Sequence, residues 1–407
     1  MDRRAFLASV AAGAIGRHAL APSAAAAQEK KGKPKRDAGL EAAVSRGLEH
    51  LKKLQAADGH WESPGGYYPT SITGVAGMAL LMEGSTLREG KYSDQIQKAV
   101  KWFLAPARQQ PNGLLGNVNN PTESSRYMYG HGFGTMFLAS VYGEEEDNEQ
   151  RKKLEKVITK AVDFTCKAQT SKKHKLPEGK EVEIGGWGYT SAADTGGGGF
   201  DEGSCTVPQI QALRAARNAG IKVPKEAVDK ADHYLDACTT PDGGIVYNYT
   251  GHSGAGQGRP PLTAAALACG LGTGKFTEAI RVMTGKNPPK GTDRPSIVRW
   301  FEYCRKNIPV AKGRVPHEEY MMYYFAQAMY ALGDDRYAQL FPGEPRETHL
   351  TWTKFKEAYF HYILESQDKN TGGWVGSGSY GIGPTFVTAI NLSILQLENG
   401  ILPIYQR

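Results

Sequence analysis

A short repeated pattern constrains the fold of this chain more than any other feature of its sequence. In its clearest copy, RGLEHLKKLQAADGHW (46–61), a helical segment ends near Gln55 and is followed by Gly59 and Trp61. Related residues recur at similar offsets: Gln109 and Gly113; Gln169, Gly185 and Trp187; Thr239, Gly243 and Ile245; Gln367, Gly372 and Trp374. A sixth, degenerate copy is RWFEYCR (299–305). Internal repeats of this kind predict one structural unit that stacks on copies of itself.

A second, more apolar segment follows each copy after a polar loop rich in Gly or Pro. These segments span residues 70–82, 127–143, 204–220, 260–272, 317–333 and 384–397. They are too long for ordinary strands, and several place apolar residues three and four apart, which is typical of helices. Their many small residues allow helix axes to approach closely, as an inner ring requires. The more charged first helices suit an outer ring.

We therefore predict an all-α fold in which six helix–loop–helix repeats close into an (α/α)6 toroid, a single domain over residues 39–407. An open solenoid is the competing arrangement, but six copies with apolar inner segments favour closure. In each repeat we expect the Gln to bond a helix end. We expect the Gly to allow a turn with positive φ, and the Trp to fill the seam between units.

The amino terminus, MDRRAFLASVAAGAIG, has the features of an export signal. Two arginines, Arg3 and Arg4, precede a short apolar run, and small residues follow at a cleavage site before Gln28. Residues 1–27 are therefore predicted to be a twin-arginine signal peptide, with an ordinary secretory signal as the alternative. Residues 28–38 are predicted to be a basic disordered linker. The mature protein is expected to be periplasmic or extracellular.

Charge and composition exclude several other classes. The net charge of +7 comes partly from the leader and is otherwise spread along the chain, so we expect no nucleic-acid partner. Beyond the leader no apolar run approaches the roughly 20 residues that span a bilayer. The five cysteines are odd in number and form no C-x-x-C pair, which favours buried thiols over a disulfide framework.

The Q-x(3–4)-G-x-W pattern at Gln55–Trp61 and Gln367–Trp374 resembles the prenyltransferase and squalene oxidase repeat. The similarity covers roughly residues 40–407 and implies an α/α toroid. The run DGGIVY and the ending LPIYQR look like exported bacterial proteins of this superfamily, which generally lack an assigned activity. Its better-known members are triterpene cyclases, protein prenyltransferase β subunits and complement-like thioester domains. One fold serves several functions, so the resemblance says less about chemistry.

The resemblance implies that a cyclase would hold its proton donor in an Asp-rich motif at the start of an inner helix. The matching stretch here is Glu202-Gly203-Ser204-Cys205-Thr206, in which Ser204 and Cys205 replace the central aspartates. A serine hydroxyl is too weak an acid to protonate an alkene unaided. The usual cyclase mechanism is therefore not expected. The remaining candidate catalytic acids are Asp201, Glu202 and Glu318.

A zinc site of the protein prenyltransferase type would need Asp, Cys and His ligands. Asp201, Cys205 and His317 are the candidates, and carboxylate, thiolate and imidazole suit Zn²⁺. Their spacing departs from the family pattern, so we favour no metal and no other cofactor.

Polar and aromatic side chains gather near the starts of the inner helices and in the loops that precede them. A closed toroid brings these loops to one face, where aromatic walls with a few polar groups form a ligand pocket. The candidate ligand-binding residues are Tyr67, Tyr68, Arg126, Tyr127, His131, Trp187, Tyr189, Phe200, His317 and Tyr320. His131 has packing in the core as its alternative.

Three functions stay open at this point. The first is an exported toroid that binds an isoprenoid, another apolar small molecule or a protein partner without catalysis. The second is an active cyclase-like or prenyl-transferring enzyme. The third is a carbohydrate-active toroid in which aromatics stack on sugar rings and two carboxylates act as acid and base.

Overall fold

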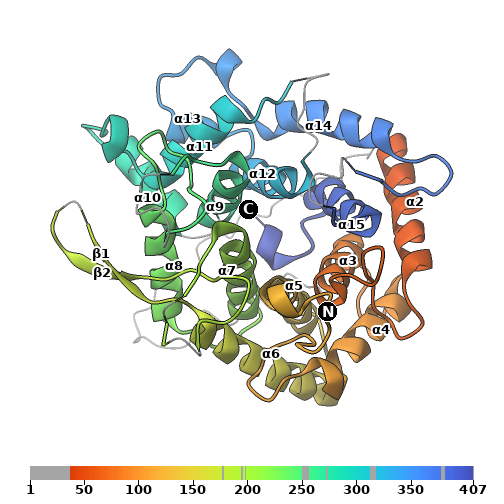
Figure 1. The fold of residues 1–407 in the computed structure, drawn as a ribbon. Helices are drawn as coiled ribbons and strands as arrows, with labels where there is room; N and C mark the ends of the chain where they lie inside the picture. Colours follow the sequence, from red (N-terminus) through yellow and green to blue (C-terminus); the bar gives the residue numbers. More distant parts are fainter. Residues whose placement is uncertain are drawn as a thin grey trace, which may run out of the picture. The chain divides into compact units, whose positions relative to one another are not determined.

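Two concentric rings of helices make up residues 38–406 of the computed structural model (Figure 1). The structure describes residues 37–176, 178–193, 196–197, 199–249, 256–271, 274–311, 318–376 and 381–406. The inner ring consists of α3 (Pro69–Glu83), α5 (Tyr127–Tyr142), α7 (Gly203–Asn218), α9 (Pro260–Leu271), α12 (Glu319–Leu332) and α15 (Pro384–Leu395). The outer ring consists of α2 (Ala38–Leu54), α4 (Ser93–Leu104), α6 (Asn148–Ala168), α8 (Lys225–Ala237), α11 (Ser296–Asn307) and α14 (Trp352–Ser366). The predicted (α/α)6 toroid is confirmed.

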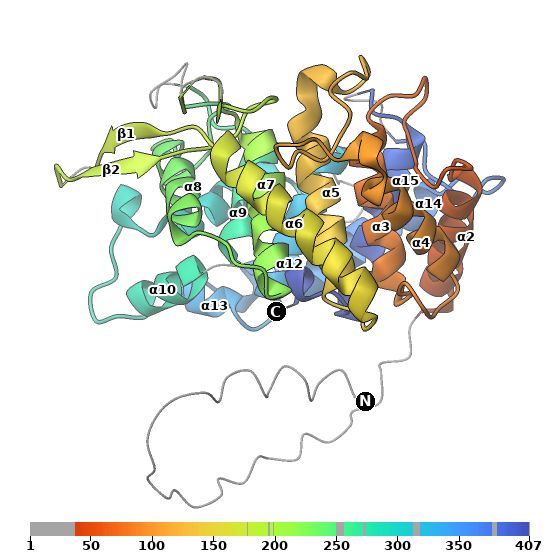
Figure 2. The ribbon, with the colours of Figure 1, turned by 90° about the horizontal axis from the view of Figure 1, so that it is seen from below.

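The loops between these helices contain smaller elements. A two-stranded antiparallel hairpin, β1 (Lys172–Lys175) and β2 (Glu181–Ile184), pairs Lys172 with Ile184 and extends from one side of the ring (Figure 2). Two short helices, α10 (Gly274–Met283) and α13 (Tyr337–Leu340), lie at the opposite end of the ring axis from the hairpin. Short 3-10 helices are η1 (Pro106–Arg108), η2 (Ser124–Arg126), η4 (Gly291–Asp293), η5 (Arg346–Thr348), η6 (Leu397–Asn399) and η7 (Pro403–Tyr405). The repeat pattern predicted none of these additions.

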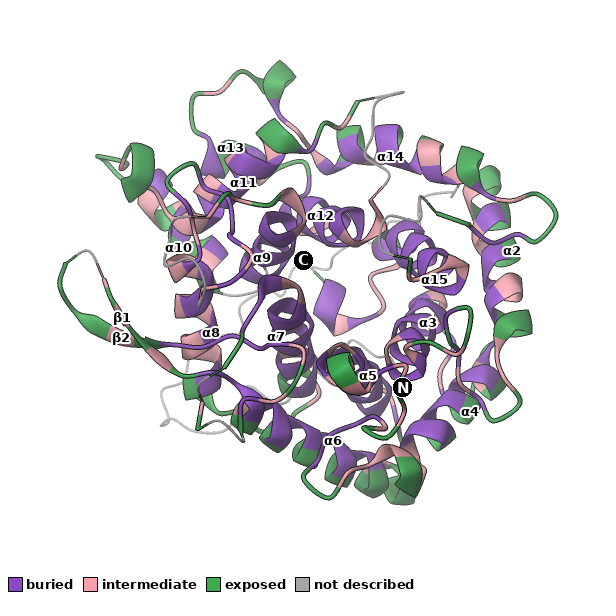
Figure 3. Ribbon diagram, viewed as in Figure 1, coloured by how far each residue is buried: buried purple, intermediate pink, exposed green. Residues whose placement is uncertain are grey.

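The inner helices are buried almost throughout, whereas the outer helices bury one face and expose the other (Figure 3). Small residues bring neighbouring inner helices close together. A β-carbon on Gly74 would lie 2.7 Å from the backbone of Phe133, and one on Gly77 would lie 2.5 Å from the Phe137 ring. Since α3 and α5 could not approach as closely with larger residues there, the expected role of the small residues is confirmed.

The repeated Gln, Gly and Trp residues join neighbouring units, and the first copy shows how. The Gln55 amide donates to the Gly59 carbonyl (2.8 Å) and to that of Gln95 on α4 (2.9 Å). Gly59 has φ +104, and a β-carbon there would lie 2.4 Å from the Lys98 carbonyl oxygen on α4. The Trp61 indole donates to the Leu51 carbonyl (2.7 Å) and is fully buried. The roles predicted for these three residue types are confirmed.

A hydroxyl on the inner helix completes this junction. Backbone N–H groups at the Trp position donate to a threonine side chain one turn into the following inner helix. The pairs are Trp61 with Thr73, Trp187 with Thr206, Ile245 with Thr263 and Trp374 with Thr388, at 2.9–3.0 Å. In the second repeat the acceptor is His131, whose Nδ1 accepts from the Leu115 N–H at 3.1 Å. We call this arrangement of Gln, Gly, seam residue and inner-helix acceptor the repeat junction.

The last repeat junction closes the ring onto the first helix. The Gln367 amide donates to the Ala43 carbonyl on α2 (2.8 Å), and the Arg46 guanidinium donates to the Gln367 side-chain oxygen (2.6 Å). Gly372, with φ +81, would place a β-carbon 2.8 Å from the Arg46 carbonyl oxygen. The bonds that join neighbouring repeats thus also join the two ends of the folded chain.

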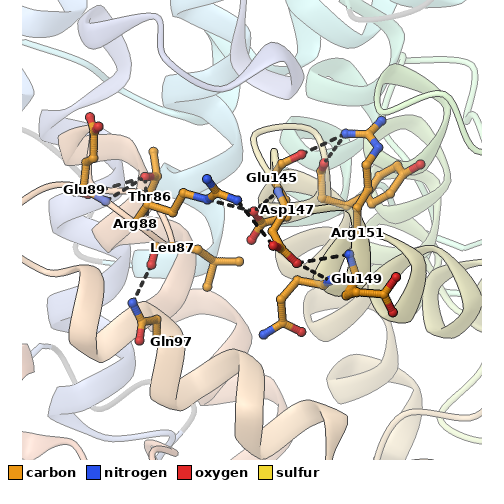
Figure 4. A network of polar contacts seen from close by, with 11 residues as sticks. Thr86, Leu87, Arg88, Glu89, Gln97, Glu145, Asp147, Glu149 and Arg151 are labelled. Carbon is orange, nitrogen blue, oxygen red and sulfur yellow. Dashed lines mark hydrogen bonds and ion pairs between the residues drawn. The ribbon is translucent and has the colours of Figure 1, made fainter.

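Polar contacts connect the first two repeats at the end of the ring where α3 and α5 finish (Figure 4). The Arg88 guanidinium contacts the buried Glu145 carboxylate (3.2 Å) and approaches Asp147 (4.0 Å). Asp147 in turn caps α6 by accepting from the Glu149 and Gln150 N–H groups. This network links the loop after α3 to the start of α6.

The carboxy-terminal segment enters the ring at the same end. Figure 1 shows it inside the circle of inner helices, and Ile404 and Tyr405 are buried there. The hydroxyls of Tyr405 and Tyr323 lie 2.6 Å apart, and the Gln396 amide donates to the Ala79 carbonyl. The segment therefore fills the centre of the ring at the end opposite the inner-helix starts.

Other sequence predictions concern parts that the structure tests only partly. The predicted signal peptide (1–27) and all but the last two residues of the predicted linker (28–38) lie outside the described residues, and α2 begins at Ala38. No helix in the described residues is long and apolar enough to cross a bilayer. All five cysteines are free, four of them buried, as expected for packed thiols.

Ring closure predicts unequal effects for two glycine substitutions. Gly372→Ala should lower the free energy of unfolding by about 3 kcal/mol or more, because the new methyl group meets the Arg46 carbonyl and the backbone is left-handed. Gly220→Ala is the matched control, since φ is +88 there but nothing lies within 4 Å of the new β-carbon. The control substitution should lower the free energy of unfolding by only about 1 kcal/mol, which is the penalty of the strained backbone. Urea unfolding compares them, and equal losses would contradict the closing role of Gly372.

Candidate functional site

A cavity of about 260 Å³ lies at the end of the ring where the inner helices begin. Each of the six inner helices contributes residues from its first turns or from the residues just before them. The lining residues are Tyr68, Ser71, Ile72, Arg126, Tyr129, Phe133, Tyr189, Ser204, Tyr247, Arg259, Pro261, Leu262, Tyr320, Ile382 and Phe386. The cavity exists because every repeat places the start of its inner helix on the same side.

Aromatic and aliphatic side chains dominate the lining. Its polar groups are the hydroxyls of Ser71, Ser204 and the tyrosines, and the guanidinium groups of Arg126 and Arg259. Among the lining residues in the described chain there is no carboxylate, imidazole or thiol. A mostly apolar wall with a few polar groups is the usual composition of a small-molecule site.

Each of the two arginines stacks on a tyrosine of the wall. The Arg126 guanidinium lies 4.7 Å from the Tyr189 ring centre, and Arg259 lies at the same distance from the Tyr247 ring. The hydroxyls of Tyr189 and Tyr247 are hydrogen-bonded to each other. Phe200 packs against both rings, with centroids 5.6 and 6.2 Å away, and is itself 41% exposed. These contacts fix the two guanidinium groups on one continuous aromatic unit.

Glu202 lies behind the cavity wall, fully buried as the N-cap of α7. Its oxygens accept from the backbone N–H groups of Ser204 (2.9 Å) and Cys205 (2.7 Å), the Ser204 hydroxyl (2.7 Å) and the Tyr129 hydroxyl (3.1 Å). The Ser204 and Tyr129 oxygens are 2.5 Å apart. With both oxygens accepting from donors, Glu202 caps the helix and orients two hydroxyls that do line the cavity.

Asp201, the second candidate acid, is also fully buried but does not line the cavity. Its carboxylate is paired with Lys172 of β1. It also accepts from the Thr170 hydroxyl and the Tyr249 N–H, both at 3.2 Å. These contacts tie the hairpin to the loop after α8, which is a structural role for a buried ion pair.

Glu318, the third candidate acid, is the N-cap of α12. One carboxylate oxygen accepts from the Met321 N–H (3.2 Å), while the other is buried without a hydrogen-bond partner. Burial, with a smaller contribution from neighbouring Glu319, raises the pKa of Glu318 to about 7. Glu318 is therefore a candidate acid with a pKa near neutrality, although it is not part of the lining.

The predicted ligand-binding residues fall into three groups. Tyr68, Arg126, Tyr189 and Tyr320 line the cavity, and Phe200 supports its wall. His131 and Trp187 are fully buried in repeat junctions, and the Tyr127 hydroxyl accepts from the Ser191 N–H. Tyr67 is 49% exposed in the loop before α3, and His317 lies outside the described residues.

His131 shows why the sequence could not distinguish residues that line the cavity from residues that are buried in the repeat junctions. Its Nε2 lies 2.9 Å from the Thr165 hydroxyl, and burial lowers its pKa to about 3. The ring is thus a neutral acceptor for the Leu115 N–H, at the position that threonine holds in four other repeats. The packing alternative describes this placement better than ligand binding does.

Of the three candidate zinc ligands, the structure describes Asp201 and Cys205. Asp201 is engaged by Lys172, and the pKa of the Cys205 thiol lies well above its usual value because of burial and the nearby Glu202 carboxylate. Among the described residues no three Asp, Glu, His or Cys side chains form a group that could hold a metal. His317 lies outside the described residues.

Several cavity residues were not among the predicted sites. They are Ser71, Ile72, Tyr129, Phe133, Ser204, Tyr247, Arg259, Pro261, Leu262, Ile382 and Phe386. A usable signal was present for them, since nearly all lie within two turns of the start of a predicted inner helix. Tyr247 follows the seam residue Ile245 by two positions, as Tyr189 follows Trp187.

Comparison with known proteins supports the fold. No protein-family model and no curated protein matches the chain. An inactive variant of the α-1,6-mannanase GH76A of Salegentibacter sp. HEL1_6, in complex with α-1,6-mannotriose, aligns over 89% of this chain and 99% of its own, with TM-score 0.54 and 11% identity. The unsaturated glucuronyl hydrolase of Bacillus sp. GL1, responsible for glycosaminoglycan degradation, aligns over 90% and 98%, with TM-score 0.54 and 13% identity. The type II terpene cyclase MstE from Scytonema aligns over 89% and 99%, with TM-score 0.49 and 14% identity. At these identities the first two establish a shared α/α toroid.

The raised pKa of Glu318 predicts a pH dependence of stability. Between pH 4.5, the usual value for this group, and about 7, the folded protein binds more protons at this carboxyl than the unfolded chain does. Its free energy of unfolding therefore falls as pH rises through that window. Glu318→Gln removes the titration and keeps an oxygen for the Met321 N–H. The free energy of unfolding of the variant, relative to that of wild type, should therefore rise by about 2 kcal/mol between pH 4.5 and pH 8.

Urea unfolding at several pH values measures this difference. Glu357→Gln, which changes an exposed acid on α14, is the control and should leave the pH profile of wild type unchanged. Parallel profiles for wild type and Glu318→Gln would contradict the burial argument.

Proposed function

We propose that this protein binds a small amphipathic molecule in the central cavity of the toroid, without performing acid–base chemistry on it. The observation that carries the proposal is the lining: six inner helices converge on one cavity and present mainly aromatic and aliphatic side chains to it. Apolar surface buried there by a ligand would contribute roughly 25 cal/mol per Å². Binding outside the cytoplasm, after export by the twin-arginine route, is part of the same proposal.

The bonding of the candidate acids supports binding rather than cyclisation. Protonation of an alkene needs an acid within reach of the substrate. Glu202 accepts from four donors behind the wall, Asp201 is paired with Lys172, and neither lines the cavity. An isoprenoid, which the repeat resemblance implies, has the apolar body that this lining suits.

A carbohydrate-active toroid is the second candidate, and the comparisons favour it. The mannanase and the glucuronyl hydrolase act on sugars and share the fold, whereas no family model supports the isoprenoid assignment. The tyrosines of the cavity also offer flat faces for sugar rings. Hydrolysis by the common mechanism needs two carboxylates flanking the bond, for which Glu202 and Glu318 would be the candidates. Neither lines the cavity, so the lining favours binding over hydrolysis.

The cavity assignment is tested with a neutral apolar probe. N-phenyl-1-naphthylamine should bind the full-length protein, purified from an exporting host, with one site per chain and increased fluorescence. Ser71→Phe, which places a ring in the lining, should weaken binding about tenfold or more, an amount that corresponds to about 1.4 kcal/mol. Ser366→Phe, on the exposed surface of α14, is the control and should bind as wild type does.

Competition then separates the two ligand classes. Displacement of the probe by farnesol or geranylgeraniol supports the apolar ligand, and displacement by α-1,6-mannotriose or by an uronic disaccharide supports the carbohydrate. Release of reducing sugar would replace the binding proposal with the hydrolase. Absence of probe binding, or full binding by Ser71→Phe, would overturn the cavity assignment.

A further inference from the structure

Two arginines that line the cavity, Arg126 and Arg259, have no carboxylate partner among the residues that the structure describes. In the described part of the chain, neither Arg126 nor Arg259 forms an ion pair or a side-chain hydrogen bond, and both are exposed at the mouth. Arg305, by comparison, is paired with Glu344. Two cations left free on the wall of one apolar cavity call for a ligand that carries negative charge.

The two guanidinium groups are held in place rather than free to move away. They stack on Tyr189 and Tyr247, whose hydroxyls bond each other and whose rings both contact Phe200. Arg126 comes from the residue before α5 and Arg259 from the residue before α9. Arginines from two different repeats are thereby fixed against a common wall, which reduces the entropy lost when both bind one anion.

The tyrosine pair adds a hydrogen-bond donor. In a bond between two hydroxyls one O–H donates and the other oxygen accepts, so the accepting tyrosine keeps its own proton for another acceptor. Burial raises the pKa of Tyr247 above its usual value, so this hydroxyl stays protonated near neutral pH. No further partner for either hydroxyl is found among the described residues. An anionic oxygen at this wall would satisfy that donor.

The inner helices favour the same sign of charge. Their N-termini, which carry partial positive charge, all surround the cavity. Glu202 and Glu318 offset this field by capping α7 and α12, but α5 has no side-chain cap and begins directly after Arg126. The start of α5, beside Arg126, therefore keeps a field that no capping carboxylate of its own offsets.

We propose that the ligand of this cavity carries an anionic group, such as a carboxylate or phosphate, which binds between Arg126 and Arg259. Its apolar body or ring would then contact Ile72, Phe133 and Phe386 deeper in the lining. This inference rests on the proposed function, because it names the chemical class of the molecule that the cavity binds. The anionic group is common to an acidic lipid-like ligand and to an acidic sugar.

The test compares one anion with its neutral analogue. The probes are 11-(dansylamino)undecanoic acid and the corresponding primary amide, titrated into full-length protein by fluorescence. Wild type should bind the acid at least tenfold more tightly than the amide, and the preference should shrink as salt is raised. Arg126→Gln and Arg259→Gln should each weaken acid binding about tenfold and weaken amide binding much less. Arg217→Gln, on the exposed last turn of α7, is the control and should change neither.

The outcomes separate this inference from the proposed function. Equal binding of acid and amide would overturn the anion site and leave the cavity assignment intact, whereas binding of neither probe would overturn both. Equal losses for acid and amide in the arginine variants would show a structural effect and overturn the anion site. Competition by farnesyl phosphate but not farnesol, or by an uronic disaccharide but not mannotriose, supports the anion site and identifies the source of the anion. Competition by each neutral compound as strongly as by its anionic counterpart contradicts it.

Discussion

The repeat junction is the interaction on which the rest of this structure depends. A glutamine or threonine, a glycine and a buried seam residue at the end of one outer helix contact the next outer helix and the following inner helix. A pair of helices cannot bury its apolar face alone, so each junction supplies what the unit lacks. Because Gln367 makes the same contacts with Ala43 that Gln55 makes with Gln95, the chain closes on itself. Closure leaves no apolar end that needs a capping repeat.

The cavity is a consequence of that closure. The junctions hold the inner helices in one direction, so all six begin on one face, and the carboxy-terminal segment fills the ring at the other. The residue before each inner helix differs among the repeats: tyrosine precedes α3, arginine precedes α5 and α9, and glutamate precedes α7 and α12.

Much of the fold could be predicted from the sequence because helix pairs and their junctions leave a periodic signal. The predicted inner segments match the inner helices to within a few residues at each end, including 127–143 for α5. The hairpin at 172–184 and the helices α10 and α13 have no counterpart in other repeats, so periodicity could not reveal them.

The site was predictable in part. The sequence pointed to inner-helix starts, and Tyr68, Arg126, Tyr189 and Tyr320 do line the cavity. The sequence could not show that His131 replaces a threonine in a repeat junction, or that Asp201 forms an ion pair with Lys172. Both contacts depend on partners that only the folded chain brings close. Apolar lining residues such as Phe133 carry no pattern that distinguishes a cavity wall from a core.

The central claim is that the mouth of this toroid binds one amphipathic anion, and a crystal structure of the protein with 11-(dansylamino)undecanoic acid tests it most directly. Our account predicts one molecule in the cavity, with its carboxylate within hydrogen-bond distance of Arg126 and Arg259 and its chain among Ile72, Phe133 and Phe386. A cavity without the molecule, or a carboxylate in solvent away from both arginines, would contradict it.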